Sequence, residues 1–105
     1  MFARSACALS LAAMASACFA SAALAAGDAA QGRVLARTWC SGCHTVEAGG
    51  SDVAPPFATI ANRPNSTESY LFTWLSDPHP PMPQLNLGRQ EIADIIAYLQ
   101  SLRRR

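Results

Sequence analysis

Two cysteines and a histidine lie close together in the run Cys40-Ser41-Gly42-Cys43-His44. Thiols separated by two residues fit on one helical turn, where both can reach the same edge of a flat ligand. The spacing C-x-x-C-H is the pattern that attaches haem covalently, with each thiol bonded to a vinyl group and the adjacent imidazole bound to iron. A bare C-x-x-C can also be a dithiol redox pair or half of a zinc site, so the rest of the sequence must separate these possibilities.

A second candidate iron ligand lies 38 residues after the histidine of this motif. Met82 stands between Pro81 and Pro83 in an otherwise polar loop. Methionines more often fill gaps in a core, but this setting favours a ligand, and a thioether stabilises ferrous iron relative to a second imidazole. His79, also flanked by prolines, is the competing ligand. We expect it instead to order the loop or to donate to a haem propionate.

Residues 1–26 are predicted to be a secretory signal peptide. Arg4 supplies a positive start, residues 9–20 form an apolar stretch, and Ala23-Leu24-Ala25 resembles an A-x-A cleavage site. The alternative is an uncleaved membrane anchor, which the high alanine and serine content disfavours. Export would place the chain in an oxidising compartment, the bacterial periplasm, where haem attachment of this kind is expected.

Removal of this leader changes the inventory of ligands. Two of the four cysteines are lost, so Cys40 and Cys43 have no second thiol pair to complete a four-thiolate zinc site. Two of the three methionines are lost as well, which leaves Met82 as the one thioether. The remaining residues 27–105 can form one small domain, and a buried porphyrin would enlarge its modest core.

The charge balance argues against nucleic-acid binding. All eight basic residues are arginines, and without the leader seven arginines stand against seven acidic residues. The positive charge gathers at Arg103, Arg104 and Arg105. We expect this tail to be a solvated chain end, and the alternative is a docking surface for an anionic partner or a lipid headgroup.

Three helices would have to position the candidate ligands. The first is predicted to begin near Asp28, a good N-cap, and to run to Trp39 at the haem motif. The second should begin at residue 65 or 66 and end before Pro78. The third should begin near Gly88 and carry an apolar stripe at helical spacing: Ile92, Ile95, Ile96, Leu99 and Leu102. No strand pattern appears, so the predicted fold class is all-α.

With these features the mature chain resembles the small bacterial class I c-type cytochromes. Members of this monohaem cytochrome c family have a helix ending in C-x-x-C-H, a proline soon after, a late Met-Pro, and a final helix with an aromatic residue before leucine. The sequence supplies the same order: Gly32, Cys40, Cys43, His44, Pro55, Met82-Pro83 and Tyr98-Leu99. The resemblance implies the class I cytochrome c fold, with three main helices around one covalently attached haem c.

The resemblance also implies roles for single residues. Cys40 and Cys43 would carry the haem, while His44 and Met82 would be the axial ligands of its iron. The second ring nitrogen of His44 would donate to a proline carbonyl, for which Pro55 fits better than its neighbour at 56.

Two further expectations concern aromatic packing. Trp74 would pack on the haem with its indole N–H toward a propionate, or belong to the core alone. Gly32 and Tyr98 would mark the crossing of the first and last helices. Relatives have an aromatic residue where this chain has Ala36, so Leu35 or Trp39 would fill part of that space.

The sequence therefore favours an electron carrier and not an enzyme. Iron held by the same two ligands in both oxidation states needs little rearrangement when it gains or loses an electron. The expected partners are a dehydrogenase or reductase and a terminal acceptor, met by a monomer through small transient interfaces. The alternatives are a haem subunit of a redox complex, and a haem sensor or enzyme with an open distal site.

Overall fold

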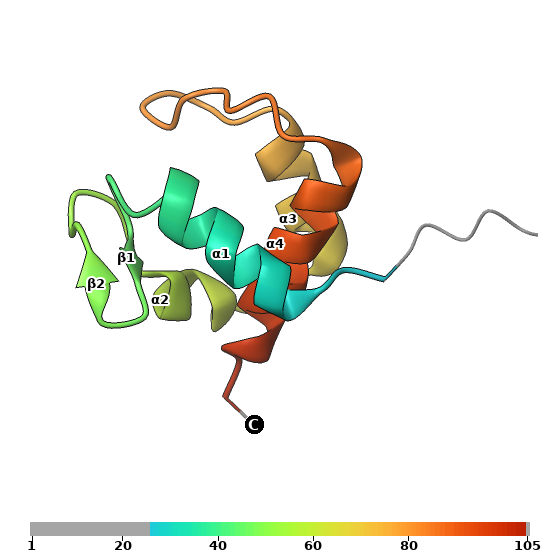
Figure 1. Ribbon diagram of the computed structural model, residues 1–105, viewed down its shortest axis with the longest axis horizontal. Coiled ribbons are helices and arrows are strands. Elements are labelled where there is room, and N and C mark those ends of the chain that lie inside the picture. The colour runs from blue at the N-terminus through green and yellow to red at the C-terminus, as the bar shows by residue number, and fades with distance from the viewer. Residues whose placement is uncertain (1–25, 105) are drawn as a thin grey trace, which may run out of the picture.

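The computed structural model describes residues 26–104, so the predicted leader up to residue 25 and Arg105 lie outside the described part. The described chain forms four helices and one two-stranded hairpin (Figure 1). In chain order these are α1 (Ala29–Trp39), β1 (Thr45–Val46), β2 (Gly49–Gly50), α2 (Phe57–Ala61), α3 (Glu68–Ser76) and α4 (Arg89–Ser101). The arrangement confirms the predicted all-α fold class, to which the hairpin adds little sheet. Within residues 26–104, no helix is long and apolar enough to span a bilayer.

Helix α1 begins where the sequence predicts, because Asp28 caps it. The Asp28 carboxylate accepts from the main-chain N–H of Ala30 at 2.9 Å and from that of Gln31 at 3.2 Å. Those donors have no partner inside the first turn of a helix. The helix ends at Trp39 with Cys40 as its C-cap, so α1 presents the haem motif at its C-terminal end.

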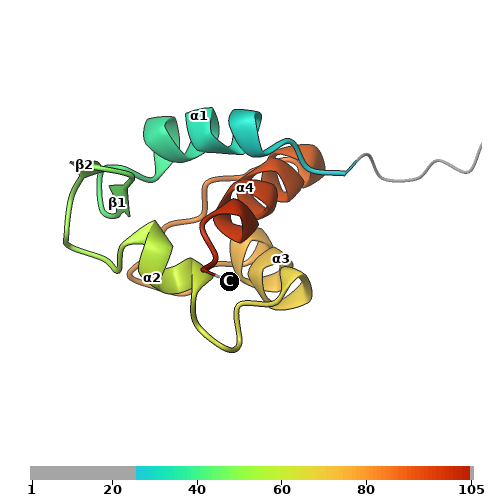
Figure 2. The same ribbon diagram turned by 90° about the horizontal axis from the view of Figure 1, so that it is seen from below.

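Helix α1 crosses α4 at very close range, and Figure 2 shows α1 and α3 on opposite sides of α4. At Gly32 a Cβ atom would overlap the carbonyl oxygen of Asp94, so only glycine permits this approach. The buried Asp94 carboxylate also accepts from the main-chain N–H of Asp28 at 2.8 Å and from the side-chain amide of Gln90 at 2.9 Å. The predicted place of Gly32 at the crossing is confirmed.

Ala36 is fully buried, and of the two residues predicted to fill the space beside it, only one does so. Leu35 packs against the core as predicted, whereas Trp39 is 58 % exposed and fills none of it. The aromatic side chains of this part of the core are Phe57 and Tyr98, whose ring centroids lie 6.2 Å apart. Phe57 thus joins the crossing of the helices to the segment after the haem motif.

Helix α3 begins later than predicted. Its first residue is Glu68, and the Thr67 side chain caps it by accepting from the N–H of Tyr70 at 3.1 Å. Ser66 does not serve as the cap because its hydroxyl is buried and donates to the carbonyl oxygen of Ile60. Helix α4, in contrast, begins directly after Gly88, as the sequence predicts.

The β1–β2 hairpin and α2 were not predicted. Elements of two and five residues are too short to show a hydrophobic period. In the hairpin, Gly50 has φ of 109° and lies against the carbonyl oxygen of His44, a conformation that favours glycine. These short elements connect the haem motif to the start of α3.

Candidate haem site

A cavity of about 410 Å³ lies between the haem motif, α3 and the loop that follows α3. Its volume is within the usual range for ligand pockets. Every residue predicted to bind or surround the haem lines it: Cys40, Cys43, His44, Pro55, Trp74 and Met82. The structure therefore brings together segments that are far apart in the sequence. The competing ligand His79 lines the same cavity.

The two cysteines of the motif line the cavity wall and form no disulfide bond with each other. Cys40 is buried and Cys43 is exposed. Burial raises the pKa of Cys40 to about 11, so its thiol stays protonated at neutral pH within this fold. The main-chain N–H of His44 donates to the carbonyl oxygen of Cys40 at 2.9 Å, which closes the motif into a turn.

The imidazole of His44 is oriented by a main-chain acceptor. Its Nδ1 atom donates to the carbonyl oxygen of Pro55 at 2.6 Å, and a parallel bridge pairs His44 with Ala54. The edge of the ring also meets Phe57, with centroids 5.4 Å apart. A donor at Nδ1 leaves Nε2 as the nitrogen that can bind a metal, and it makes that nitrogen more basic.

On the loop after α3, Met82 is half-buried and packs against the core. Its main-chain N–H donates to the carbonyl oxygen of His79 at 3.0 Å, which forms a tight turn. The indole Nε1–H of Trp74 donates to the Met82 sulfur at 3.3 Å. Among the described residues the thioether is thus the acceptor of the N–H that the resemblance directs toward a haem propionate.

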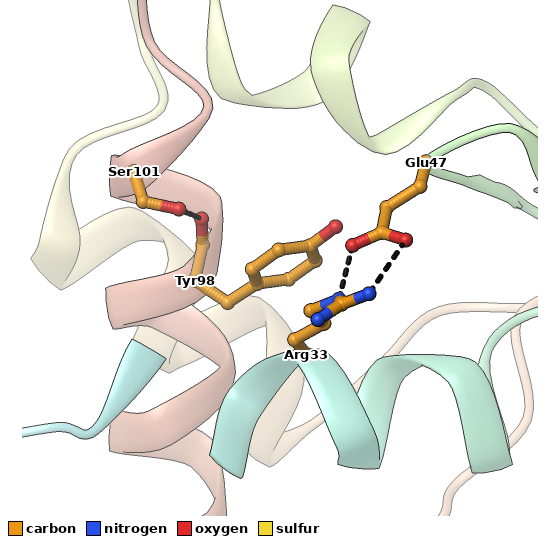
Figure 3. Close-up of polar contacts among 4 residues, drawn as sticks. All are labelled: Arg33, Glu47, Tyr98 and Ser101. Carbon is orange, nitrogen blue, oxygen red and sulfur yellow. Dashed lines mark hydrogen bonds and ion pairs between the residues drawn. The ribbon is translucent and has the colours of Figure 1, made fainter. Parts of the chain in front are cut away.

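An ion pair joins α1 to the turn of the β1–β2 hairpin (Figure 3). Arg33 donates through Nε and, at 3.2 Å, through Nη2 to the two carboxylate oxygens of Glu47, whose φ is 57°. Hydrogen bonding to Glu47 raises the pKa of Arg33. Arg33 and Glu47 lie 14 residues apart on different elements, and no sequence pattern indicates their contact.

The ring of Tyr98, from α4, lies beside this ion pair in Figure 3. Its hydroxyl is buried and has no hydrogen-bond partner among the described residues. Burial, followed by the negative charge of Glu47, raises the pKa of Tyr98. The ring fills the crossing, as predicted, while the hydroxyl contributes no bond of its own.

The chemistry of the cavity fits a covalently attached haem. The wall is largely apolar, and Arg63 is the one formally charged side chain among its lining residues. It presents two cysteine sulfurs, an imidazole oriented through Nδ1 and a thioether, which together are the donor set of a c-type site. Within residues 26–104, no three His, Cys, Asp or Glu side chains are grouped to hold a bare metal ion.

Comparison with known proteins agrees with this chemistry. The sequence model of the family described as "Cytochrome c" matches residues 29–103. The chain is 48% identical over 82 residues to cytochrome c-552 of Bradyrhizobium diazoefficiens, across 74% of this chain and 78% of that protein. It is 34% identical over 76 residues to a cytochrome c-553-like protein of Synechocystis, across 72% of this chain and 70% of that protein. The chain therefore belongs to the cytochrome c family, as a small class I c-type cytochrome that binds haem c covalently and carries electrons.

Proposed function

We propose that this chain is a periplasmic one-electron carrier whose haem is attached through Cys40 and Cys43 and held between His44 and Met82. One observation carries the proposal: the imidazole and the thioether reach the same cavity from positions 38 residues apart. Bound haem c supplies a one-electron couple at its iron. Two strong-field protein ligands keep the coordination the same in both oxidation states and leave no open position for a substrate.

The surrounding residues support transfer rather than catalysis. The apolar wall keeps water from the metal, which favours the less charged ferrous state. At the edge of the cavity Trp39 is 58 % exposed and Val53 is 79 % exposed, which gives the mouth an apolar rim. We infer that redox partners, a dehydrogenase or reductase and a terminal acceptor, meet the protein briefly at this rim.

The proposed location follows from the predicted leader. Residues 1–26 would direct export and then be removed, so that haem attachment takes place in the periplasm. A mass measurement of the mature protein tests this step. Loss of the first 25 or 26 residues together with the gain of one haem is the expected result, and an intact leader would favour the membrane-anchored form.

Optical spectra of the holoprotein test the proposed ligands. The ferric protein should show a low-spin spectrum with the weak far-red band of a methionine-to-iron bond, and Met82→Ala should abolish that band. His79→Ala is the matched control, since it removes the competing ligand from the same turn and should leave the band in place. A wild-type low-spin spectrum that lacks the band, and that becomes high-spin in His79→Ala but not in Met82→Ala, would assign the distal position to His79.

The same preparation separates a carrier from a sensor or enzyme. A filled distal position makes the ferrous protein indifferent to carbon monoxide. An immediate spectral shift on addition of carbon monoxide, with a high-spin ferric spectrum, would contradict Met82 ligation and support an open site. Co-purification with a dehydrogenase or oxidase would indicate a haem subunit of a complex.

A further inference from the structure

The end of α4 is tied to the segment between α2 and α3 by one side chain, Asn62. Its amide nitrogen donates to the carbonyl oxygen of Leu102 at 3.1 Å and to that of Ala58 at 2.7 Å. Its amide oxygen accepts from the main-chain N–H of Arg104 at 2.8 Å. Figure 2 shows the C-terminal end of the chain close to α2. The main chain of the tail is therefore held in place up to Arg104.

This contact gathers three arginines at one end of the molecule. Arg63 directly follows Asn62, while Arg103 and Arg104 belong to the tail that Asn62 holds. All three are exposed, and the one ion pair within residues 26–104 lies elsewhere, between α1 and the hairpin. We call Arg63, Arg103 and Arg104 the basic end.

The charge of the described chain is unevenly distributed. Residues 26–104 contain six arginines and seven acidic residues, and half of the arginines belong to the basic end. The rest of this range thus has three arginines against seven acidic residues. Such a separation of charge gives the molecule a dipole, which turns the positive end toward a negatively charged surface during an encounter.

The basic end also adjoins the haem cavity. Arg63 lines that cavity and is the one formally charged side chain among its lining residues. A surface that binds to the basic end therefore also lies against one wall of the haem cavity. An electron would have a short path between the cavity and such a surface.

We propose that the basic end is a docking surface for an acidic patch on a redox partner protein. This inference rests on the proposed function, in which the chain carries one electron to or from that partner. One electron passes between the two proteins, and no covalent bond forms or breaks. An anionic lipid surface offers the same charge, but it would cover this wall with material that accepts no electron. The position of Arg63 therefore favours a protein partner.

Two double variants of equal net charge test the position of the charge. Arg103→Gln with Arg104→Gln removes two charges of the basic end. Arg37→Gln with Arg89→Gln is the matched control, because these two arginines are exposed and do not line the haem cavity.

The probe is a gold electrode with a carboxylate-terminated monolayer, which presents the chemistry of an acidic patch and reports both binding and electron transfer of the holoprotein. At low ionic strength we expect the variant of the basic end to bind about tenfold more weakly than the wild-type protein. The control should bind no more than about twofold more weakly. Equal losses in the two variants would mean that only net charge matters, and they would overturn the inference.

The wild-type protein provides a second test that needs no variant. Its binding should weaken when the salt concentration rises from about 20 mM to about 200 mM, because salt screens exposed charges over that range. Bound protein should exchange electrons with the electrode. Binding that is insensitive to salt, or binding without electron exchange, would overturn the inference.

Vesicles that contain phosphatidylglycerol separate a lipid surface from a protein partner. If the variant of the basic end lost binding to these vesicles and kept its binding to the carboxylate monolayer, the basic end would be a lipid-binding surface and the inference would be wrong. A wild-type protein without the far-red methionine band would instead contradict the proposed function, whichever surface it bound.

Discussion

The two walls of the haem cavity hold their proposed iron ligands by different means. On the proximal wall, His44 is held by main-chain atoms, with Nδ1 on the Pro55 carbonyl and the N–H on the Cys40 carbonyl. On the distal wall, Met82 is held by its own turn and by one side chain, Trp74. A ligand fixed by the main chain tolerates most nearby substitutions, whereas a ligand fixed by a side chain can be tuned by one residue.

The largest expected effect comes from a substitution that forces the backbone of α1, which leads into the proximal wall, away from α4. In Gly32→Ala the added methyl group would overlap the carbonyl oxygen of Asp94, so α1, which carries the haem motif, must move away from α4. We expect the free energy of unfolding to fall by about 3 kcal/mol, measured by denaturant unfolding of the holoprotein. Gly42→Ala is the matched control.

That control lies within the haem motif itself, where a Cβ atom would meet nothing within 4 Å. It should change the free energy of unfolding by no more than about 0.5 kcal/mol. An equal loss in both variants would mean that the motif is sensitive to any added methyl group, and the close crossing of α1 and α4 would not be the cause.

The sequence predicted the proximal wall more completely than the distal wall. The haem motif is local, and Asp28 provides a cap for α1 that can be read directly from the residue type. The predicted start of α3 was wrong because Ser66 and Thr67 are equally good caps in sequence. Only the burial of Ser66 shows that its hydroxyl has another partner. Choices of this kind depend on tertiary contacts.

The side-chain contacts around the site had no signal in the sequence for the same reason. The contact of Trp74 with the Met82 sulfur depends on how the loop folds back on α3. The pairing of Arg33 with Glu47 depends on a two-residue hairpin that is too short to predict. Residue types identified the donor set, while the three-dimensional path of the loops decided what surrounds it.

A smaller effect is expected from a substitution in the loop that forms the distal wall. The side-chain amide of Gln84 donates to the carbonyl oxygen of Ser76 at 3.0 Å and accepts from the N–H of Asn86 at 3.0 Å, which ties the loop to the end of α3. Gln84→Ala should reduce the free energy that holds the loop in its folded position by about 1 kcal/mol. We expect added imidazole to displace Met82 from ferric iron about fivefold more readily, the equivalent of that energy.

Gln31→Ala serves as the matched control for this loop variant. Gln31 is exposed on α1, far from the loop in sequence, and it does not line the cavity, so its loss should leave imidazole displacement unchanged. If Gln84→Ala also left displacement unchanged, Met82 would be held by Trp74 and its own turn alone. The contrast between the two walls would then depend on a single side chain.

An effect of similar size, but of opposite sign, is expected at Tyr98 on α4. Tyr98→Phe keeps the ring against Phe57 and removes a buried hydroxyl that has no partner among the described residues. We expect the free energy of unfolding at neutral pH to rise by about 1 kcal/mol, because the folded state no longer buries an unsatisfied group. Tyr70→Phe, at a ring that is 42 % exposed, is the control and should change little.

The pH dependence of the free energy of unfolding provides a second test of the buried Tyr98 hydroxyl. Burial raises the pKa of Tyr98 above its ordinary value of 10.0, so near that pH the unfolded chain loses the proton first. The wild-type protein should therefore lose stability as the pH rises past about 10, and Tyr98→Phe should lack that loss. The difference in the free energy of unfolding between Tyr98→Phe and the wild-type protein should therefore increase between pH 7 and pH 10.5, measured by urea unfolding. A difference that decreases instead would mean that the ionised hydroxyl gains a hydrogen-bond partner in the folded state, and that this contact stabilises the proximal wall.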